Sequence, residues 1–428
     1  MRRESSLAVV GAGWAGLAAA VRATEAGARV SVFEMSPSPG GRARSVERGG
    51  ELVDNGQHIL IGAYRRCLAL MSTIGVDEAS AFARLPLALV DAQGRGLRLP
   101  AGSPLASFAR GVAGHPAWSW RDKLSLLGHA ARWAAGGFAV DPDRPVSQWC
   151  AALPAAVRRE LIEPLCVAAL NTEASQASAR VFLRVLRDGL FTGRGGADLL
   201  LPRVALGDLF PAPALAWLRG RGAAIRLGRR VMAIGREGGA WLVDGQPFDS
   251  VVLACSAREA ARLTQPTDGT WAGTAARFAY EPIVTAWLDA PALRAPFPMI
   301  ALAGEPAQFA FDLGHLHPAW TGRMTLVASG ARRWVEAGAA AFETALGEQI
   351  GRELAPLLPA GYRIVATTTE KRATFRCTPG LVRPRQVIAP GLTAAGDYVA
   401  GPYPATLEGA VRSGEAAVEM ARRTGPGT

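Results

Sequence analysis

Residues 7–16 read Leu-Ala-Val-Val-Gly-Ala-Gly-Trp-Ala-Gly, a short apolar strand that runs directly into the glycine spacing G-x-G-x-x-G. Gly11 allows the tight turn out of the strand, Gly13 lets the backbone approach a pyrophosphate, and Gly16 lets the next helix pack close to the sheet. A helix that begins here directs its unpaired N–H groups and the positive end of its dipole at the phosphates. The stretch therefore predicts a dinucleotide site.

The residues that follow complete this unit. The helix is expected to end at Gly27, and residues 28–33 (Ala-Arg-Val-Ser-Val-Phe) supply a second strand. Glu34 comes directly after that strand, where a carboxylate binds a ribose diol. A glycine pattern alone is a weak signal. Strand, glycines, helix, strand and acid in register make it specific.

The loops after Glu34 indicate which dinucleotide the site binds. Residues 35–44 read Met-Ser-Pro-Ser-Pro-Gly-Gly-Arg-Ala-Arg, and residues 53–58 read Val-Asp-Asn-Gly-Gln-His. A simple NAD-binding domain does not need these segments. Their order resembles the flavoprotein family of amine oxidases and phytoene desaturases, in which a Gly-Gly-Arg segment lines the FAD pyrophosphate and the later loop approaches the flavin. An ordinary surface turn is the alternative for Gly40 and Gly41.

The C-terminal part of the chain supports the same cofactor. Residues 391–397 (Gly-Leu-Thr-Ala-Ala-Gly-Asp) are typical of a strand, and residues 404–418 of a helix with Pro404 in its first turn. In the family that this sequence resembles, the aspartate at the position of Asp397 binds the ribityl or pyrophosphate part of FAD. The helix N-terminus points at the pyrimidine edge of the flavin, where its dipole stabilises the negative charge of the reduced ring. An N-cap or turn role is the alternative for Asp397.

These motifs together predict FAD as the cofactor. The resemblance also implies that Val231, after a predicted strand and turn at 222–231, contacts the adenine. The predicted cofactor-binding residues are Gly11, Ala12, Gly13, Trp14, Ala15, Gly16, Glu34, Met35, Gly40, Gly41, Arg42, Ala43, Gly56, Gln57, His58, Val231, Gly396, Asp397, Ala405, Thr406 and Leu407. No second G-x-G-x-x-G follows a strand, so a built-in NADPH domain is not expected.

The length of 428 residues, of which 49% are hydrophobic, predicts two domains. By the resemblance, the fold class is α/β. A Rossmann-like FAD-binding domain of the amine oxidase type takes residues 1–85, 205–265 and 370–428, and an inserted α+β substrate-binding domain takes residues 86–204 and 266–369. Within the first domain we expect a hairpin edge at 241–248 and a buried strand at 249–254.

Composition excludes several other classes of protein. The five cysteines are scattered and never form C-x-x-C, which favours a reducing cytoplasm. There is no room for a cleavable signal peptide before the first strand, and no apolar run is long enough to span a bilayer. The net charge of +11 is spread along the chain, so no nucleic-acid partner is expected. Asp312, His315 and His317 read as loop residues, and no metal site is predicted.

One stretch concentrates tryptophan, leucine and basic residues. Residues 103–138 read SPLASFARGVAGHPAWSWRDKLSLLGHAARWAAGGF, with Asp122 as the sole acid. The stretch either lies on an anionic membrane, on the inner face of the cytoplasmic membrane, or forms an amphipathic helix pair over a substrate cavity. In the first interpretation the residues that meet the lipid headgroups are Trp118, Trp120, Trp133, Arg110, Arg121, Lys123 and Arg132.

Four further segments narrow the resemblance. Residues 164–172 (PLCVAALNT), 181–188 (VFLRVLRD), 373–380 (ATFRCTPG) and 401–412 (GPYPATLEGAVR) are similar to those of the squalene-associated FAD-dependent desaturases, the hydroxysqualene dehydroxylases. The resemblance implies that hydroxysqualene, a lipophilic isoprenoid alcohol made from presqualene diphosphate, is reduced to squalene for hopanoid synthesis, with a functional link to squalene-synthase-like enzymes.

Three other functions remain open at this point: a carotenoid or phytoene-type desaturase, a flavin amine oxidase, and a flavin-binding protein without turnover. An amine oxidase typically places a lysine near N5 of the flavin, and Lys371 is the one plausible candidate.

The implied reaction needs a proton donor and a hydride donor. An acid that assists departure of the hydroxyl leaves an allylic cation, which takes hydride from reduced FAD in a dry, apolar pocket. Motif position places Tyr403, Tyr398 and His58 beside the flavin as candidate catalytic groups, with packing as the alternative for the tyrosines. Asn171 and Thr172 either orient the substrate hydroxyl or cap a helix.

Overall fold

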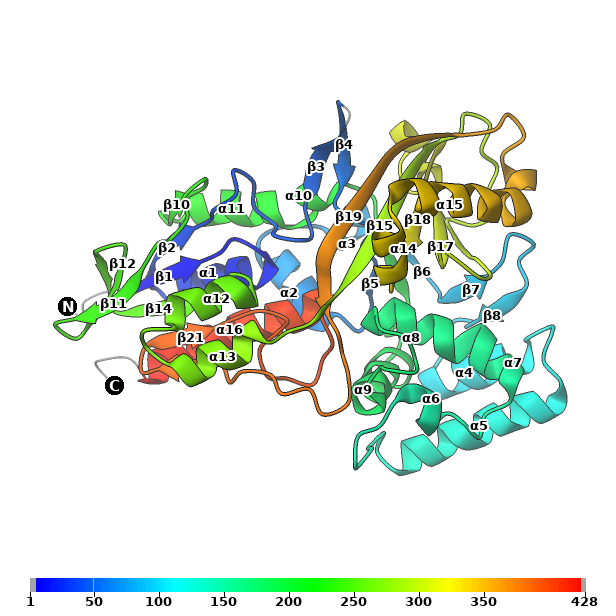
Figure 1. Ribbon diagram of the computed structural model, residues 1–428, viewed down its shortest axis with the longest axis horizontal. Coiled ribbons are helices and arrows are strands. Elements are labelled where there is room, and N and C mark those ends of the chain that lie inside the picture. The colour runs from blue at the N-terminus through cyan, green and yellow to red at the C-terminus, as the bar shows by residue number, and fades with distance from the viewer. Residues whose placement is uncertain (1–4, 49, 425–428) are drawn as a thin grey trace.

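The computed structural model describes residues 5–48 and 50–424 (Figure 1). Its first body is built on a six-stranded sheet whose strands come from three separated parts of the chain. In spatial order these are β10 (Ala224–Arg226), β2 (Arg29–Phe33), β1 (Ser6–Val10), β14 (Ser250–Leu253), β21 (Leu392–Ala394) and β20 (Val387–Ala389). All neighbouring pairs are parallel except β21 with β20.

The two faces of this sheet are both covered, which explains the continuous apolar run of β1. Leu7 and Val9 pack with the helices α1 (Trp14–Glu25), α11 (Pro211–Arg219) and α16 (Leu407–Thr424). Successive side chains of a strand point to opposite faces, so Ala8 and Val10 join the other core. The elements on that side are β11 (Ile234–Glu237), β12 (Ala240–Val243), β13 (Gln246–Phe248), α12 (Ala257–Thr264) and α13 (Gly269–Ala276).

Most of the elements predicted in this body are confirmed, and one boundary is wrong. The strand and turn predicted at 222–231 are present, since the strand ends at Arg226 and Gly228 turns the chain with a φ of +68°. The predicted helix at 404–418 begins at Leu407, so Pro404 lies outside its first turn. Thr406 sets that start, since its hydroxyl accepts a hydrogen bond from the N–H of Gly409 at 3.1 Å.

Two helical glycines give a matched prediction. A Cβ at Gly414 of α16 would collide with the carbonyl oxygen of Ala15 in α1, whereas a Cβ at Gly128 has no neighbour within 4 Å. Alanine improves helix propensity at both positions, so we expect Gly128→Ala to stabilise the protein by about 1 kcal/mol. Gly414→Ala is expected to destabilise it by about 1–3 kcal/mol, because the two helices must move apart. Urea unfolding measures both, and equal stabilisation would contradict this close approach.

The second body contains an antiparallel sheet in the order β16 (Met299–Ala301), β17 (Phe309–Asp312), β18 (Arg323–Ala328), β15 (Tyr280–Asp289) and β19 (Arg363–Phe375). The helices α14 (Arg332–Ala337) and α15 (Ala339–Glu353) pack on it. The long strands β15 and β19 run from this sheet toward the first body (Figure 1). The two bodies are therefore joined by continuous strands. The limits of the two domains at residues 85, 204, 265 and 369 stay a prediction.

Helices and small sheets complete the molecule around the two bodies. The helices are α2 (Arg65–Thr73), α3 (Glu78–Ala81), α4 (Pro104–Ala113), α5 (Trp120–Ala135), α6 (Val146–Trp149), α7 (Ala155–Val157), a π-helical turn at Arg158–Ile162, α8 (Glu163–Leu170), α9 (Ala179–Leu190) and α10 (Leu206–Leu209). The remaining strands form three small sheets. One pairs β3 (Ser45–Arg48) with β4 (Glu51–Asp54), one pairs β7 (Ala88–Val90) with β8 (Gly96–Arg98), and the third has the order β5 (Leu60–Ile61), β9 (Leu199–Pro202), β6 (Phe82–Leu85).

The tryptophan-rich stretch at 103–138 is a helix pair, α4 and α5, and part of its predicted role is wrong. Trp118 and Trp133 are buried, because they pack in the core against the neighbouring helices. Lys123 is buried too, and its ammonium donates to the carbonyl of Ala113 at 2.7 Å. These three side chains cannot meet a lipid headgroup, while Trp120 is 66% exposed. Within the described ranges, no helix has the length and apolar character needed to cross a membrane.

Candidate active site

A cavity of about 1510 Å³ lies between the first body, the antiparallel sheet and the helices α8 and α9. It is larger than the pockets of about 300–1,000 Å³ that hold drug-sized ligands, so it has room for a dinucleotide and a second ligand. Every predicted cofactor-binding residue lines it except Ala12 and Gly16, and so do Tyr398 and Tyr403. The sequence motifs therefore meet at one place.

The three glycines of the first motif have different surroundings. Gly11 has a φ of +110°, and a Cβ there would lie 2.5 Å from the carbonyl oxygen of Ala254. A Cβ at Gly16 would collide with the carbonyl oxygen of Gly11. Gly16 therefore allows the helix to pack closely against the turn, and it does not line the cavity. At Gly13 a Cβ meets only the Cα of Gly41, at 3.8 Å, so the backbone is open toward the cavity. This is the approach that a pyrophosphate requires.

Glu34 is fixed at the end of β2 by the backbone around it. Its side chain is buried, and its two carboxylate oxygens accept hydrogen bonds from the N–H groups of Ala12 and Ser36, both at 2.7 Å. Ala12 does not line the cavity, but it holds this carboxylate and also accepts a hydrogen bond from the N–H of Gly40 at 2.8 Å. Ala12 thus joins the glycine turn to the Gly-Gly-Arg loop.

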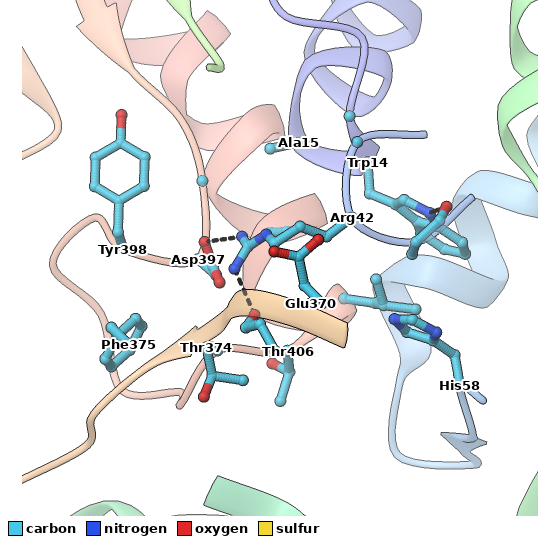
Figure 2. Close-up of a pocket in the computed structure, with 18 of the residues that line it drawn as sticks. Trp14, Ala15, Arg42, His58, Glu370, Thr374, Phe375, Asp397, Tyr398 and Thr406 are labelled. Carbon is cyan, nitrogen blue, oxygen red and sulfur yellow. Dashed lines mark hydrogen bonds and ion pairs between the residues drawn. The ribbon is translucent and has the colours of Figure 1, made fainter. Parts of the chain in front are cut away.

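Arg42 and Asp397 connect the N-terminal and C-terminal motifs, which are 355 residues apart (Figure 2). The guanidinium donates to Asp397 Oδ1 and to the carbonyl of Ala373, both at 2.7 Å. Burial alone lowers the pKa of Arg42, but the ion pair with Asp397 outweighs it and raises that pKa. A permanent cation therefore lines the cavity beside the open glycines. Glycine backbone, cation and ribose-binding carboxylate together fit FAD.

His58 faces the cavity as a neutral ring. Its Nδ1 lies 3.0 Å from the carbonyl oxygen of Gly56, and a carbonyl only accepts, so Nδ1 carries the proton. Burial lowers the pKa of His58, and the charge of Arg42 lowers it further. At neutral pH the free Nε2 is therefore an acceptor. This state suits binding a hydroxyl group better than it suits donating a proton.

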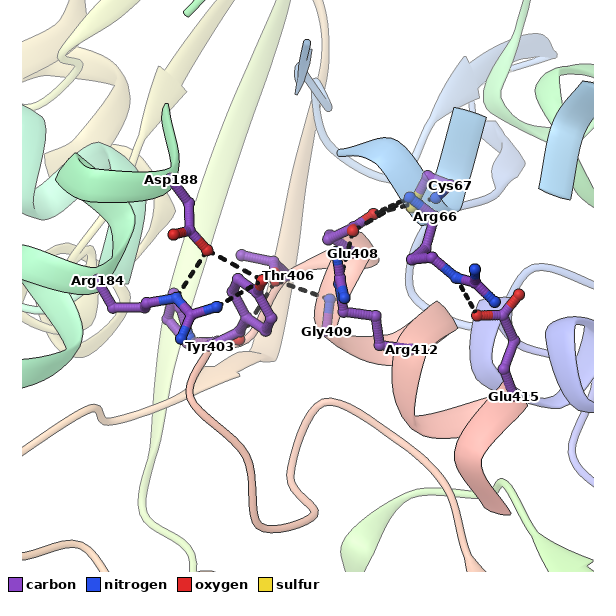
Figure 3. Close-up of polar contacts among 11 residues, drawn as sticks. Arg66, Cys67, Arg184, Asp188, Tyr403, Thr406, Glu408, Gly409, Arg412 and Glu415 are labelled. Carbon is purple, nitrogen blue, oxygen red and sulfur yellow. Dashed lines mark hydrogen bonds and ion pairs between the residues drawn. The ribbon is translucent and has the colours of Figure 1, made fainter. Parts of the chain in front are cut away.

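The two candidate tyrosines have different partners. The Tyr398 ring is buried against Phe278, and within the part of the chain that the structure describes its hydroxyl has no hydrogen-bond partner. The Tyr403 hydroxyl donates to Asp188 Oδ2 at 3.0 Å and accepts from Arg184 Nη2 at 3.1 Å (Figure 3). Burial raises the pKa of both tyrosines, so both are protonated at neutral pH. Only Tyr403 has a cation placed to stabilise its phenolate.

Arg184 and Asp188 were not among the predicted site residues. They lie four residues apart on α9 and form an ion pair at 2.7 Å. Burial alone raises the pKa of Asp188, but hydrogen bonds from Arg184, Arg187 and Tyr403 outweigh it and lower that pKa. The i, i+4 spacing of an arginine and an aspartate was a signal in residues 181–188 that could have indicated the pair.

Glu408 fixes the start of α16 against α2 (Figure 3). Its side chain is buried and accepts hydrogen bonds from the backbone N–H groups of Arg66 and Cys67 at the start of α2, at 3.0–3.2 Å. Arg412, one turn further along α16, pairs with the same carboxylate at 2.7 Å. A carboxylate is stabilised at a helix N-terminus. The anchored helix holds the preceding residues Ala405 and Thr406 in the cavity wall.

Glu370 of β19 is a second lining residue that the motifs missed. Its carboxylate accepts hydrogen bonds from Asn55 Nδ2 and from the N–H of Arg372, both at 3.1 Å, and it lies beside Arg42 (Figure 2). Lys371 is next to it in the strand, is exposed and does not line the cavity. The candidate lysine of an amine oxidase is therefore not at this site.

Asn171 and Thr172 are structural residues, as the capping interpretation predicts. Asn171 ends α8 with a φ of +46°. Its amide donates to the carbonyl of Glu281 at 3.1 Å and to Thr374 Oγ1 at 3.0 Å, and it accepts from the N–H of Gly330 at 2.6 Å. The Thr172 hydroxyl is bound to the carbonyl of Leu170. Neither is free to orient a substrate.

The histidines near Asp312 are engaged by the backbone. His315 Nε2 bonds the carbonyl of Ala295 at 2.9 Å, and His317 Nδ1 accepts from the N–H of Ala319 at 3.2 Å. Among the described residues, no group of three or more His, Cys, Asp and Glu side chains is arranged to hold a metal ion.

The end of the cavity away from the glycines is apolar. Side chains from α8, α9 and the antiparallel sheet line it, including Leu165, Val185, Leu186, Leu190, Met299, Phe309 and Phe311. A long apolar ligand can bury its surface here with one end beside the polar wall.

Comparison with known proteins identifies the family of the chain. The model of the flavin containing amine oxidoreductases matches residues 14–421. A hydroxysqualene dehydroxylase of Rhodopseudomonas palustris is 28% identical and covers 97% of this chain and 98% of its own. A hydroxysqualene dehydroxylase of Sinorhizobium fredii is 27% identical and covers 96% of this chain and 97% of its own.

Solved structures share the fold at low identity. A triple mutant of putrescine oxidase has a TM-score of 0.72 at 17% identity and covers 98% of this chain and 99% of its own. An oxidoreductase from Methanosarcina mazei has a TM-score of 0.71 at 16% identity and covers 97% of this chain and 100% of its own. The α/β fold class and the FAD cofactor expected from the sequence are confirmed. The chain belongs to the family of flavin-containing amine oxidoreductases and is an FAD-dependent enzyme.

Proposed function

We propose that the protein reduces hydroxysqualene to squalene. The observation that carries the proposal is a cavity with a flavin-type polar wall at one end and a long apolar lining at the other. The proposal is supported by full-length similarity to proteins named hydroxysqualene dehydroxylase. The apolar lining suits an isoprenoid better than a small polar amine, and the exposed Lys371 weakens the amine oxidase alternative.

Different residues of the chain bind the cofactor, exclude water and bind the substrate hydroxyl group. Gly13, Glu34, Arg42 and Asp397 would hold FAD, which when bound in its reduced form supplies a hydride. The apolar side chains exclude water, which otherwise recaptures an allylic cation as the alcohol. Neutral His58 accepts a hydrogen bond from a hydroxyl group at Nε2. In the balanced reaction, the alcohol, one proton and one hydride give the hydrocarbon and one water.

Tyr403 is the acid that the geometry favours. Its hydroxyl donates to Asp188 in the structure and would have to turn to the substrate, so that its proton leaves with the substrate hydroxyl group as water. The phenolate that remains would accept a charge-assisted hydrogen bond from Arg184, which offsets the nearby Asp188 carboxylate. The guanidinium groups of Arg184 and Arg412 also lie over the Tyr403 ring, at 5.0 and 5.4 Å from its centroid. Among the described residues, no cation occupies either position at Tyr398, so its buried phenolate is the more costly one.

Isotope transfer tests the reaction. Photoreduced protein carrying deuterium at N5 of the flavin is mixed anaerobically with hydroxysqualene, and the extract is analysed by mass spectrometry. We expect squalene with one deuterium at the former carbinol carbon or its allylic partner, because the hydride comes from the flavin. Reduced protein that leaves hydroxysqualene unchanged would refute the proposal. Squalene labelled from deuterated water, in a single turnover that is faster than exchange of the N5 proton with solvent, would refute the hydride step.

A further inference from the structure

The outer side of the α4–α5 pair is unusually apolar for an exposed surface. Nine large hydrophobic side chains are exposed in the described part of the chain, and three of them lie here: Leu105 at 65%, Trp120 at 66% and Leu124 at 64%. Figure 1 shows α5 along the outer edge of the molecule, away from the first body. Exposed apolar groups that gather in one place mark an interaction site more often than single ones do.

The exposed residues of α5 follow one side of the helix. Trp120, Leu124, Gly128, Ala131 and Ala135 are all exposed and recur at intervals of three or four residues. Buried Lys123 holds the indole of Trp120 in place, with its ammonium 4.8 Å from the ring centroid. The result is a fixed apolar stripe along α5, which we call the outer face.

The charge beside the outer face is positive. Arg110, Arg121 and Arg132 are exposed on the same two helices. Asp122, the sole acid in residues 103–138, is used in the capping box with Ser119, whose hydroxyl donates to Asp122 at 2.7 Å. An apolar stripe flanked by arginines and lacking free acid complements an anionic lipid surface.

A second cavity adjoins the start of α4. It measures about 250 Å³ and is lined by Pro104 and Ser107 of α4 and by residues 193–198. Leu87, Leu190 and Ala197 line both this cavity and the apolar end of the large one. The small cavity therefore adjoins both the start of α4 and the substrate space.

We propose that the outer face docks on an anionic lipid bilayer, and that a lipophilic substrate passes between the bilayer and the large cavity through the small one. Trp120 and Leu124 enter the headgroup region while Arg121 and Arg132 contact lipid phosphates. The docking itself does not depend on the substrate. The passage rests on the proposed function.

Vesicle flotation tests the docking with the FAD-loaded protein. We expect binding to vesicles containing phosphatidylglycerol at low ionic strength, weaker binding to pure phosphatidylcholine, and partial release by salt. The pairs Trp120→Ser with Leu124→Ser, and Arg121→Gln with Arg132→Gln, should each lower the partition coefficient about tenfold or more. A matched control, Leu52→Ser with Met232→Ser, removes side chains that are 68% and 62% exposed elsewhere and should have no effect. A wild-type protein that stays with the soluble fraction, or a control pair that loses binding equally, would refute the docking.

Turnover tests the passage separately. With hydroxysqualene supplied in anionic vesicles, the Trp120→Ser, Leu124→Ser pair should slow squalene formation about tenfold, and with substrate in detergent micelles it should match the wild type. If this double variant no longer floats with vesicles but forms squalene from vesicle-borne substrate as fast as the wild type, the proposed passage is wrong. Absence of turnover in every format would contradict the proposed function, while the flotation result still decides the docking.

Discussion

The Gly13→Leu variant is expected to purify as a folded, colourless protein without FAD. Gly13 has a φ of −73° and a ψ of 178°, which any residue adopts without strain. A Cβ there contacts only the Cα of Gly41, so the new side chain extends into the cavity where the backbone must approach the pyrophosphate. Occupancy of FAD, measured by absorbance after release from the protein, should fall at least tenfold while the circular dichroism spectrum is unchanged.

The control for this variant is Gly351→Leu in α15, where a Cβ also has no neighbour within 4 Å. This residue is exposed and does not line the cavity, so flavin content should equal that of the wild type. Full FAD occupancy in Gly13→Leu would show that the pyrophosphate does not lie at this turn.

Tyr403→Phe is expected to slow the single-turnover oxidation of the reduced flavin by hydroxysqualene about 10²-fold, the usual scale for loss of a proton-transfer group. Flavin content should be unchanged. Tyr398→Phe removes the same atom from the same cavity, but from a hydroxyl without a stabilising cation, so its rate should stay within a few-fold of wild type. Stopped-flow absorbance measures both. Equal rates for Tyr403→Phe and the wild type would remove Tyr403 from the role of acid.

The pH profile of the same reaction separates the tyrosine from the histidine. The pKa of Tyr403 is raised above its ordinary value of 10.0, so this acid keeps its proton from pH 6 to 9 and the rate should be flat. The pKa of His58 is lowered from 6.5, so a histidine that acts as the acid loses its proton as the pH rises through a value below 6.5. The rate of the reaction would then fall over the same pH range. A tenfold fall in rate for each unit of pH above 7 would assign proton transfer to His58.

What the sequence predicts well is local. The turn at Gly11 and the strand before it follow from residues that are neighbours in the chain, and the continuous apolar run at 251–253 indicates a strand buried on both faces. The cofactor motifs could be placed because each is a short backbone geometry that a few residue types permit.

What the sequence misses depends on pairs that only folding brings together. Tyr403 is 215 residues from Asp188 and 219 from Arg184, and no local pattern reports that contact. The composition of 103–138 did not show which tryptophans of α4–α5 face the core, because that depends on the packing of α7 and α9 against the pair. Glu370 and Lys371 are adjacent in β19, and which of them faces the cavity is set by the path of that strand between the two bodies.

The order of strands in the six-stranded sheet has a consequence for biosynthesis. β14 pairs with β21, and Asp397 and α16 follow β21, so the cofactor site lacks one wall until these C-terminal elements have left the ribosome. Until then the nascent chain carries β14 with an unpaired edge and α1 without its partner helix, both of which are surfaces prone to aggregation. We therefore expect FAD to bind only once Asp397 and α16 have been made, because a chain that ends before Asp397 has the glycine turn but no closed site for the cofactor.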